Sequence, residues 1–141
     1  CTVYPRFEGV IPGKVSNVIL RNIICHSENG IYLAAEKPGF IEDILFDGVK
    51  VKIDKQSKWP SAFYDRRPYY KESSKIPTHI SAFYGENAAE IELRNCQVKW
   101  QTNSDECWYG VEMKNVEDLC IANFKGTSAH PEKYETINKH T

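Results

Sequence analysis

The sequence predicts an all-β protein, specifically a right-handed parallel β-helix of about four coils with three strands per coil. Three observations lead to this prediction: short runs alternate apolar and polar residues, Asn or Gly follows many of these runs, and two segments match each other 28 residues apart. A chain of 141 residues fits one domain. We therefore expect a single β-helix domain over residues 1–141, with a long loop excursion at 54–78 and a non-repeat tail at 128–141.

The internal repeat is clearest in the second half of the chain. Residues 83–95 match residues 111–123, with apolar residues at the same places, and a shorter version of the pattern occurs at 18–22 and again at 44–48. Each repeat is too short to hold a crossover helix, so three brief strands are expected to follow one another round a common axis. Asparagine tolerates the backbone of a tight turn and bonds locally. Stacked repeats are therefore expected to align Asn22, Gly48, Asn95 and Asn123.

Composition excludes several classes of protein. The formal net charge is −1, which argues against a dedicated nucleic-acid binder, and no apolar run is long enough for a transmembrane helix. The five cysteines and four histidines lack metal-ligand spacing, so we expect no metal site and no cofactor. Cys96 and Cys120 are expected to be small core residues. Cys1 has an alternative interpretation as the lipid-bearing first residue of a bacterial lipoprotein.

A sandwich of two antiparallel sheets is the competing fold. It also produces short strands joined by Gly and Asn turns. It does not predict two segments that match at one fixed spacing with coincident asparagines, so the sequence favours the β-helix.

Three runs, at 15–24, 41–49 and 81–96, resemble the C-terminal coils of polygalacturonase-like glycoside hydrolases, and Tyr64-Asp-Arg-Arg-Pro68 is similar to a loop of their bacterial relatives. The resemblance covers most of residues 15–130. It implies a β-helix and a longer parent that hydrolyses pectin-type polysaccharide with inversion. The Asn-Thr-Asp, Asp-Asp, Gly-His-Gly and Arg-Ile-Lys strings of that family do not occur here. The catalytic residues are therefore unknown, and the chain is expected to be a C-terminal portion.

Six residues are the candidate contacts to a polysaccharide. Strand alternation is expected to turn Tyr32, Tyr84 and Glu112 outward into one exposed column, where aromatic faces suit sugar rings. In the excursion, an aromatic residue is expected to stack on a sugar, and an arginine to pair with a uronate carboxylate. The alternative packs the excursion's aromatics onto the barrel wall and bonds its arginines internally. The candidate substrate-binding residues are Trp59, Tyr64, Arg66, Arg67, Tyr84 and Glu112.

Three functions stay open at this point: the C-terminal part of a polygalacturonase-like enzyme, a non-catalytic glycan-binding or structural module, and a calcium-dependent pectate-lyase-like protein. Asp105 and Glu106 are expected to be solvated turn residues, with an acid/base or calcium role as the alternative. The expected partner is an acidic pectin-type polysaccharide. Because an open first coil exposes unpaired backbone groups, we also expect missing N-terminal coils or end-to-end self-association. A secreted, periplasmic or cell-surface location follows from that substrate.

Overall fold

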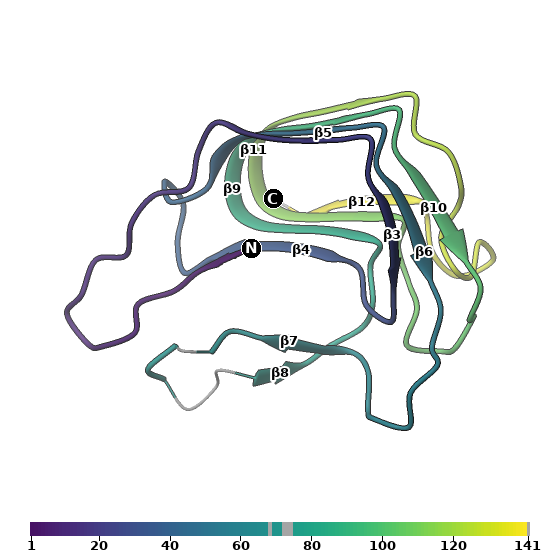
Figure 1. Cartoon of the computed structure of the whole chain (residues 1–141), viewed down its shortest axis with the longest axis horizontal. Coiled ribbons are helices and arrows are strands. Elements are labelled where there is room, and N and C mark those ends of the chain that lie inside the picture. Colours follow the sequence, from purple (N-terminus) through teal and green to yellow (C-terminus); the bar gives the residue numbers. More distant parts are fainter. Residues whose placement is uncertain (68, 72–74, 141) are drawn as a thin grey trace.

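The computed structural model of the chain is all-β, and it describes residues 1–67, 69–71 and 75–140 (Figure 1). Parts of the predicted excursion, at 68 and 72–74, and the last residue of the predicted tail lie outside the described residues. The described residues form twelve strands: β1 Thr2–Val3, β2 Val18–Arg21, β3 Ile24–Ser27, β4 Ile31–Ala35, β5 Glu42–Asp47, β6 Lys50–Ile53, β7 Phe63–Asp65, β8 Lys75–Pro77, β9 Phe83–Arg94, β10 Gln97–Trp100, β11 Val111–Ala122 and β12 Ile137–His140.

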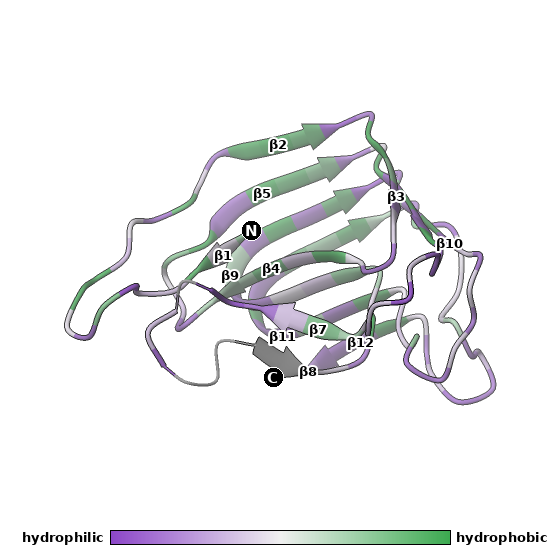
Figure 2. Cartoon of the chain, turned by 60° about the horizontal axis from the view of Figure 1, so that its bottom comes forward, coloured by the Kyte–Doolittle hydropathy of each residue, from purple (hydrophilic) through white to green (hydrophobic). Residues whose placement is uncertain are grey.

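These strands lie in three sheets. The seven-stranded sheet runs in the order β1-β4-β9-β11-β12, and β2 joins it through β5, which pairs with β9. The three-stranded sheet has the order β10-β6-β3, and both of these sheets are parallel. The third sheet is the antiparallel pair β7–β8 within the excursion. Figure 2 shows the parallel strands of the seven-stranded sheet side by side.

The predicted right-handed parallel β-helix of about four coils with three strands each is wrong. The strands are divided among separate sheets, and the number of strands per stretch of chain is not constant. β9 and β11 are continuous strands of 12 residues where the repeat pattern predicts two short ones. The physical reason is that Asn87 takes a positive φ of 55° inside β9 and bends the strand without ending it. The antiparallel sandwich is also wrong, because the two larger sheets are parallel.

The all-β class and the alignment of the repeats are confirmed. Val111 pairs with Phe83, and the pairing continues to Ala122 and Arg94. The shorter match holds as well, since Val18 pairs with Ile44. The tail differs from the prediction because its end forms β12, which pairs with β11.

The core fills the space between the inner faces of the two larger sheets. Phe46 and Phe83 meet edge to face, with ring centroids 5.8 Å apart. Val51 and Val98 project into the same core from the three-stranded sheet. Of the two cysteines predicted to be core residues, Cys96 is buried and Cys120 is exposed. The prediction for Cys120 is therefore wrong, because it lies on the outward-facing side of β11.

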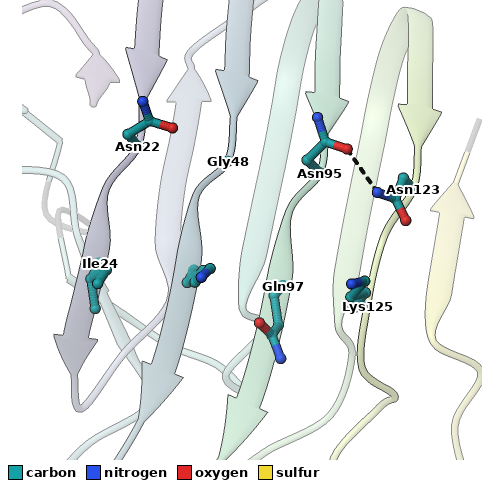
Figure 3. A pocket seen from close by; sticks show the side chains of 8 residues that line it. Asn22, Ile24, Gly48, Asn95, Gln97, Asn123 and Lys125 are labelled. Carbon is teal, nitrogen blue, oxygen red and sulfur yellow. Dashed lines mark hydrogen bonds between the residues drawn. The ribbon is translucent and has the colours of Figure 1, made fainter.

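The predicted alignment of asparagines is confirmed at the turn that joins the two larger sheets. Asn22, Asn95 and Asn123 have φ of 56°, 53° and 56°, and the Asn123 side-chain amide donates to Asn95 Oδ1 at 2.7 Å (Figure 3). Gly48 occupies the equivalent place, also with positive φ. A Cβ there would lie 2.9 Å from Asn22 Oδ1. Glycine therefore leaves room for the amide of the neighbouring turn.

Candidate functional site

The predicted column lies on the face of the seven-stranded sheet opposite the core. Tyr32, Tyr84, Glu112 and Asn138 occupy matching positions on β4, β9, β11 and β12, and we call these four residues the outer column. The column exists as predicted, but it is not an exposed track. Only 4% of Tyr84 and 1% of Glu112 is accessible to solvent. Tyr64 of the excursion packs on Tyr84, and His79 and Ser81, just after the excursion, contact Glu112. The expectation of an open polysaccharide track is therefore wrong at these two residues.

Tyr64 of β7 is the side chain that closes the excursion over the column. Its ring stacks on Tyr32 with centroids 4.0 Å apart and planes at 20°, and it also contacts Tyr84 at 4.7 Å. Tyr32 and Tyr84 stack on each other at 5.0 Å. Burial raises the pKa of the Tyr64 phenol, and its hydroxyl has no hydrogen-bond partner among the described residues. The three tyrosines therefore form one packed layer, in keeping with the alternative that places the aromatics on the wall.

Arg66 fixes the same hairpin to the sheet. Its Nη2 donates to Glu86 Oε2 at 3.1 Å, and its guanidinium lies 4.9 Å from the centre of the Tyr4 ring. The Tyr84 hydroxyl donates to the same Glu86 oxygen at 3.1 Å. Burial, and then the charge of Glu86, raise the pKa of Tyr84. The forked hydrogen-bonding end of Arg66 is thus already engaged within the protein.

The remaining two excursion candidates are exposed. The Arg67 side chain is 69% accessible and forms a close ion pair with Asp65. Trp59 is 68% accessible, and the Lys58 ammonium lies 5.4 Å from the centre of its ring. The Trp59 carbonyl accepts a hydrogen bond from Lys55 Nζ at 2.6 Å, which anchors the backbone beneath the ring. Both side chains are exposed to solvent, but the Arg67 guanidinium is bonded to Asp65, so Trp59 is the more open of the two.

Glu112 is the centre of a buried charge cluster. One of its oxygens, Oε2, lies 2.6 Å from His79 Nε2 and accepts a hydrogen bond from Ser81 Oγ at 2.6 Å. The other, Oε1, lies 3.3 Å from Lys114 Nζ and 3.5 Å from His140 Nε2. Burial by itself raises the pKa of Glu112. The hydrogen bonds from His79 and Ser81 and the charges of His79 and Lys114 outweigh it and bring the pKa to about 2.

His79 is held on its ring faces as well as at its nitrogen. It stacks on Trp108 with centroids 3.8 Å apart and planes at 4°, and Trp108 stacks in turn on Tyr134 at 4.8 Å. No pattern in the sequence points to His79, because it stands alone, just after the excursion. Strand alternation does find Glu112, but it cannot show that two histidines and a serine from other parts of the chain lie around it.

Chemically, the cluster supplies a carboxylate that is ionised near neutral pH and orients a histidine. It does not supply a carboxylic acid able to protonate a leaving group near neutral pH. The turn acids do not join it: the Asp105 side chain is 96% accessible, and Glu106 accepts a hydrogen bond from Ser61 at 2.7 Å. In the described part of the chain, no group of three or more His, Cys, Asp or Glu side chains is placed to hold a metal ion.

Comparison with known proteins returns no relative. No protein-family model matches the chain, and neither the curated proteins nor the solved structures contain a match. The resemblance to polygalacturonase-like hydrolases therefore stays a prediction from the sequence motifs. Within the described residues, no helix has the length and apolar character needed to cross a membrane.

Proposed function

We propose that this chain is part of a carbohydrate-active protein and contributes a surface that binds acidic, pectin-type polysaccharide. The observation that carries the proposal is an exposed aromatic ring beside a cation on the excursion. Trp59 is 68% accessible, and the Lys58 ammonium lies 5.4 Å from the centre of its ring. A ring face stacks on a sugar ring, and a neighbouring cation pairs with a carboxylate on that sugar.

The exposed pair Trp59 and Arg67 is the part of this surface most open to a ligand. A uronate that stacks on Trp59 places its carboxylate within reach of Lys58, whose ammonium lies 5.4 Å from the centre of the ring. The partly exposed Lys114 of β11 adds a further ammonium group beside the column. Since polymers of this kind occur outside cells, the proposal also implies a secreted, periplasmic or cell-surface location.

A binding contribution is favoured over a catalytic one. The carboxylate at the centre of the cluster is held ionised by its partners, with a pKa of about 2. An inverting glycosidase needs a second, protonated carboxyl about 6.5–9.5 Å from the first. The motifs that supply this pair in the resembled family are not present in the sequence. Catalysis is therefore assigned to another part of a longer parent, with this chain as scaffold and binding surface.

Isothermal titration with oligogalacturonates tests the proposal. Trp59→Ala and Arg67→Gln are expected to weaken binding by about tenfold when combined, because a stacking contact and a charged contact are lost. Arg66→Ala is a poor choice, since it breaks the bond to Glu86 that holds the hairpin. Ile11→Ala, which removes a 79% exposed apolar side chain outside the excursion, is the control and should leave affinity unchanged. Absence of measurable affinity for any acidic oligosaccharide would contradict the proposal.

A further inference from the structure

The outward face of the three-stranded sheet carries an unusual concentration of positive charge. Lys50 and Lys52 project outward from β6, Lys99 projects from β10 beside Lys52, and His26 projects from β3 on the other side. Lys125 extends the row, because it forms a bridge with Gln97, which pairs with Lys50. Parallel strands lie about 4.8 Å apart, and alternate residues of one strand about 7 Å apart. The four ammonium groups therefore share one small area, which we call the basic surface.

The lysines of the basic surface have no negative partner among the described residues. Lysines elsewhere do: Lys14 pairs with Glu42, and Lys55 with Glu28. The acids that flank the basic surface are already engaged, with Asp47 3.0 Å from Arg21 and Glu28 3.0 Å from Lys55. The positive charge is therefore not cancelled within the described part of the chain, although the whole chain has a net charge of −1.

Two shallow grooves run across this surface and share Ile24, Lys50 and Gln97 in their walls. The side-chain amides of Asn22, Asn95 and Asn123 border the first groove together with Lys125, and Figure 3 shows them along its upper edge. Ile24 is 72% exposed and forms an apolar patch between the charges. Amides that can bond hydroxyl groups, an apolar patch and regularly placed ammonium groups therefore lie side by side.

We propose that the basic surface binds an acidic polysaccharide, with the lysines meeting uronate carboxylates along the polymer. Charge complementarity requires a polyanion. The choice among polyanions rests on the groove walls, which contain amides and an aliphatic side chain but none of the aromatic platforms on which single-stranded nucleic acids stack. A polyuronate carries one carboxylate per sugar together with several hydroxyl groups, which matches this mixture. The polymer class rests on the proposed function; the surface does not.

In a parallel sheet, the equivalent outward-facing residues of neighbouring strands lie one strand spacing apart. A linear polymer lying across the strands meets equivalent side chains at each step, as in the row of Ile24, Lys50, Gln97 and Lys125. The polymer is therefore expected to run across β3, β6 and β10 rather than along them. This direction is distinct from the excursion face, where Trp59 and Arg67 lie.

The test is a titration of the full chain with an oligogalacturonate, with the fully methyl-esterified oligomer as the uncharged probe. Lys50→Gln combined with Lys99→Gln is expected to weaken binding of the charged oligomer by about tenfold at low salt. Added NaCl should weaken the wild-type interaction further, and the esterified oligomer should not bind. The matched control is Lys37→Gln with Lys133→Gln, which removes the same charge elsewhere and should leave affinity unchanged.

The same titration, repeated on the Trp59→Ala/Arg67→Gln variant and followed by NMR, separates this inference from the proposed function. Loss of binding in the lysine variant, with amide shifts in β3, β6 and β10, supports the basic surface. Loss only in the Trp59/Arg67 variant overturns the basic surface and leaves the proposed function standing. Equal binding of the esterified oligomer overturns the role of charge. Single-stranded DNA that binds as tightly as the oligogalacturonate overturns the assignment to a polysaccharide.

Discussion

Single residues hold the excursion and the sheet together through contacts that join distant parts of the chain. Glu112 is the clearest case, because its two oxygens meet groups from β11, β12 and the segment before β9. A buried carboxylate with cationic and hydroxyl partners is costly to lose, because its partners remain desolvated once it is gone.

Replacing this carboxylate tests how much it contributes to the stability of the fold. Glu112→Gln is expected to lower the free energy of unfolding by about 3–5 kcal/mol, since the variant leaves His79 and Lys114 without their counter-charge. Urea denaturation at pH 7 measures the change. Glu117→Gln, an exposed position on the same strand, is the control and should change stability by less than about 0.5 kcal/mol. Equal stability of the two variants would show that the cluster does not stabilise the fold.

The depressed pKa of Glu112 also predicts that the protein loses stability as the pH falls. The pKa is about 2 in the folded protein against a model-peptide value of 4.5, so the unfolded chain takes up the proton first as pH falls. The contribution is complete above about pH 5 and declines as pH falls through 4.5 toward 2. Thermal unfolding between pH 7 and pH 2 should therefore show a steeper loss for wild type than for Glu112→Gln. Parallel curves would contradict the prediction.

The aligned asparagines make a second prediction for single residues. Asn95→Ala should cost about 1–2 kcal/mol, from the lost bond with Asn123 and because alanine lacks the side-chain amide that lets asparagine tolerate a left-handed turn. Asn95→Gly keeps the turn and loses only the bond, so it should recover part of that cost. Denaturant midpoints of the two variants give the comparison. A glycine variant less stable than the alanine variant would contradict the role of φ.

The sequence predicts these turn residues well and the charge cluster poorly. Asn22, Asn95 and Asn123 each follow a short alternating run, and Asn95 and Asn123 lie 28 residues apart, so these residues align once the strands pair. His79 and Ser81 reach Glu112 only because the excursion folds back over β9, and the sequence spacing does not encode that return. The same return explains why Tyr84 is buried rather than presented to solvent.

Among the elements, β9 and β11 connect the strands of the seven-stranded sheet. Each pairs over its whole length, and β9 joins β4 through its first residues and β5 through its last. The alternating pattern predicts the strands and their register. It cannot distinguish a turn at Asn87 from a bend within one strand, because asparagine is suited to both. That ambiguity is why the sequence predicts coils of three short strands, which the structure does not contain.

The start of β4 offers a sharp test at the level of elements. A Cβ on Gly30 would lie 1.8 Å from the backbone oxygen of Ser81, and backbone atoms cannot move aside cheaply. Gly30→Ala should therefore lower stability by about 3 kcal/mol or more, by pushing β4 away from β9. Gly13→Ala is the control, because no heavy atom lies within 4 Å of a Cβ there. Thermal melting of both variants measures the difference, and equal melting points would contradict the close approach.

At the scale of the whole molecule, the strands at the β2 and β3 end have partners on one side only among the described residues. An apolar opening at this end is lined by Leu20, Ile23 and Phe46. Unpaired strand edges beside apolar side chains favour association with another chain. End-to-end self-association therefore stays a prediction, and we expect the contact between chains at the β2 and β3 end of the molecule.

Sedimentation velocity over a range of concentrations tests this association. The wild-type chain is expected to show species that grow with concentration, and Ile23→Lys should shift them toward monomer, because a charge in the opening is costly to bury. Ile19→Lys, at a 63% exposed position in β2, is the control. Circular dichroism shows whether each variant is folded. A single monomeric species for the wild type at high concentration would contradict the prediction.

The sandwiched position of Trp108 has a practical consequence. Its indole lies against the His79 ring at 3.8 Å and the Tyr134 ring at 4.8 Å, whereas Trp59 is largely surrounded by water. Indole emission responds to groups in direct contact with it, so the two tryptophans differ as fluorophores. Light emitted by Trp108 reports on whether the segment after the excursion is seated. The molecule thus contains its own optical probe for the step that buries Glu112.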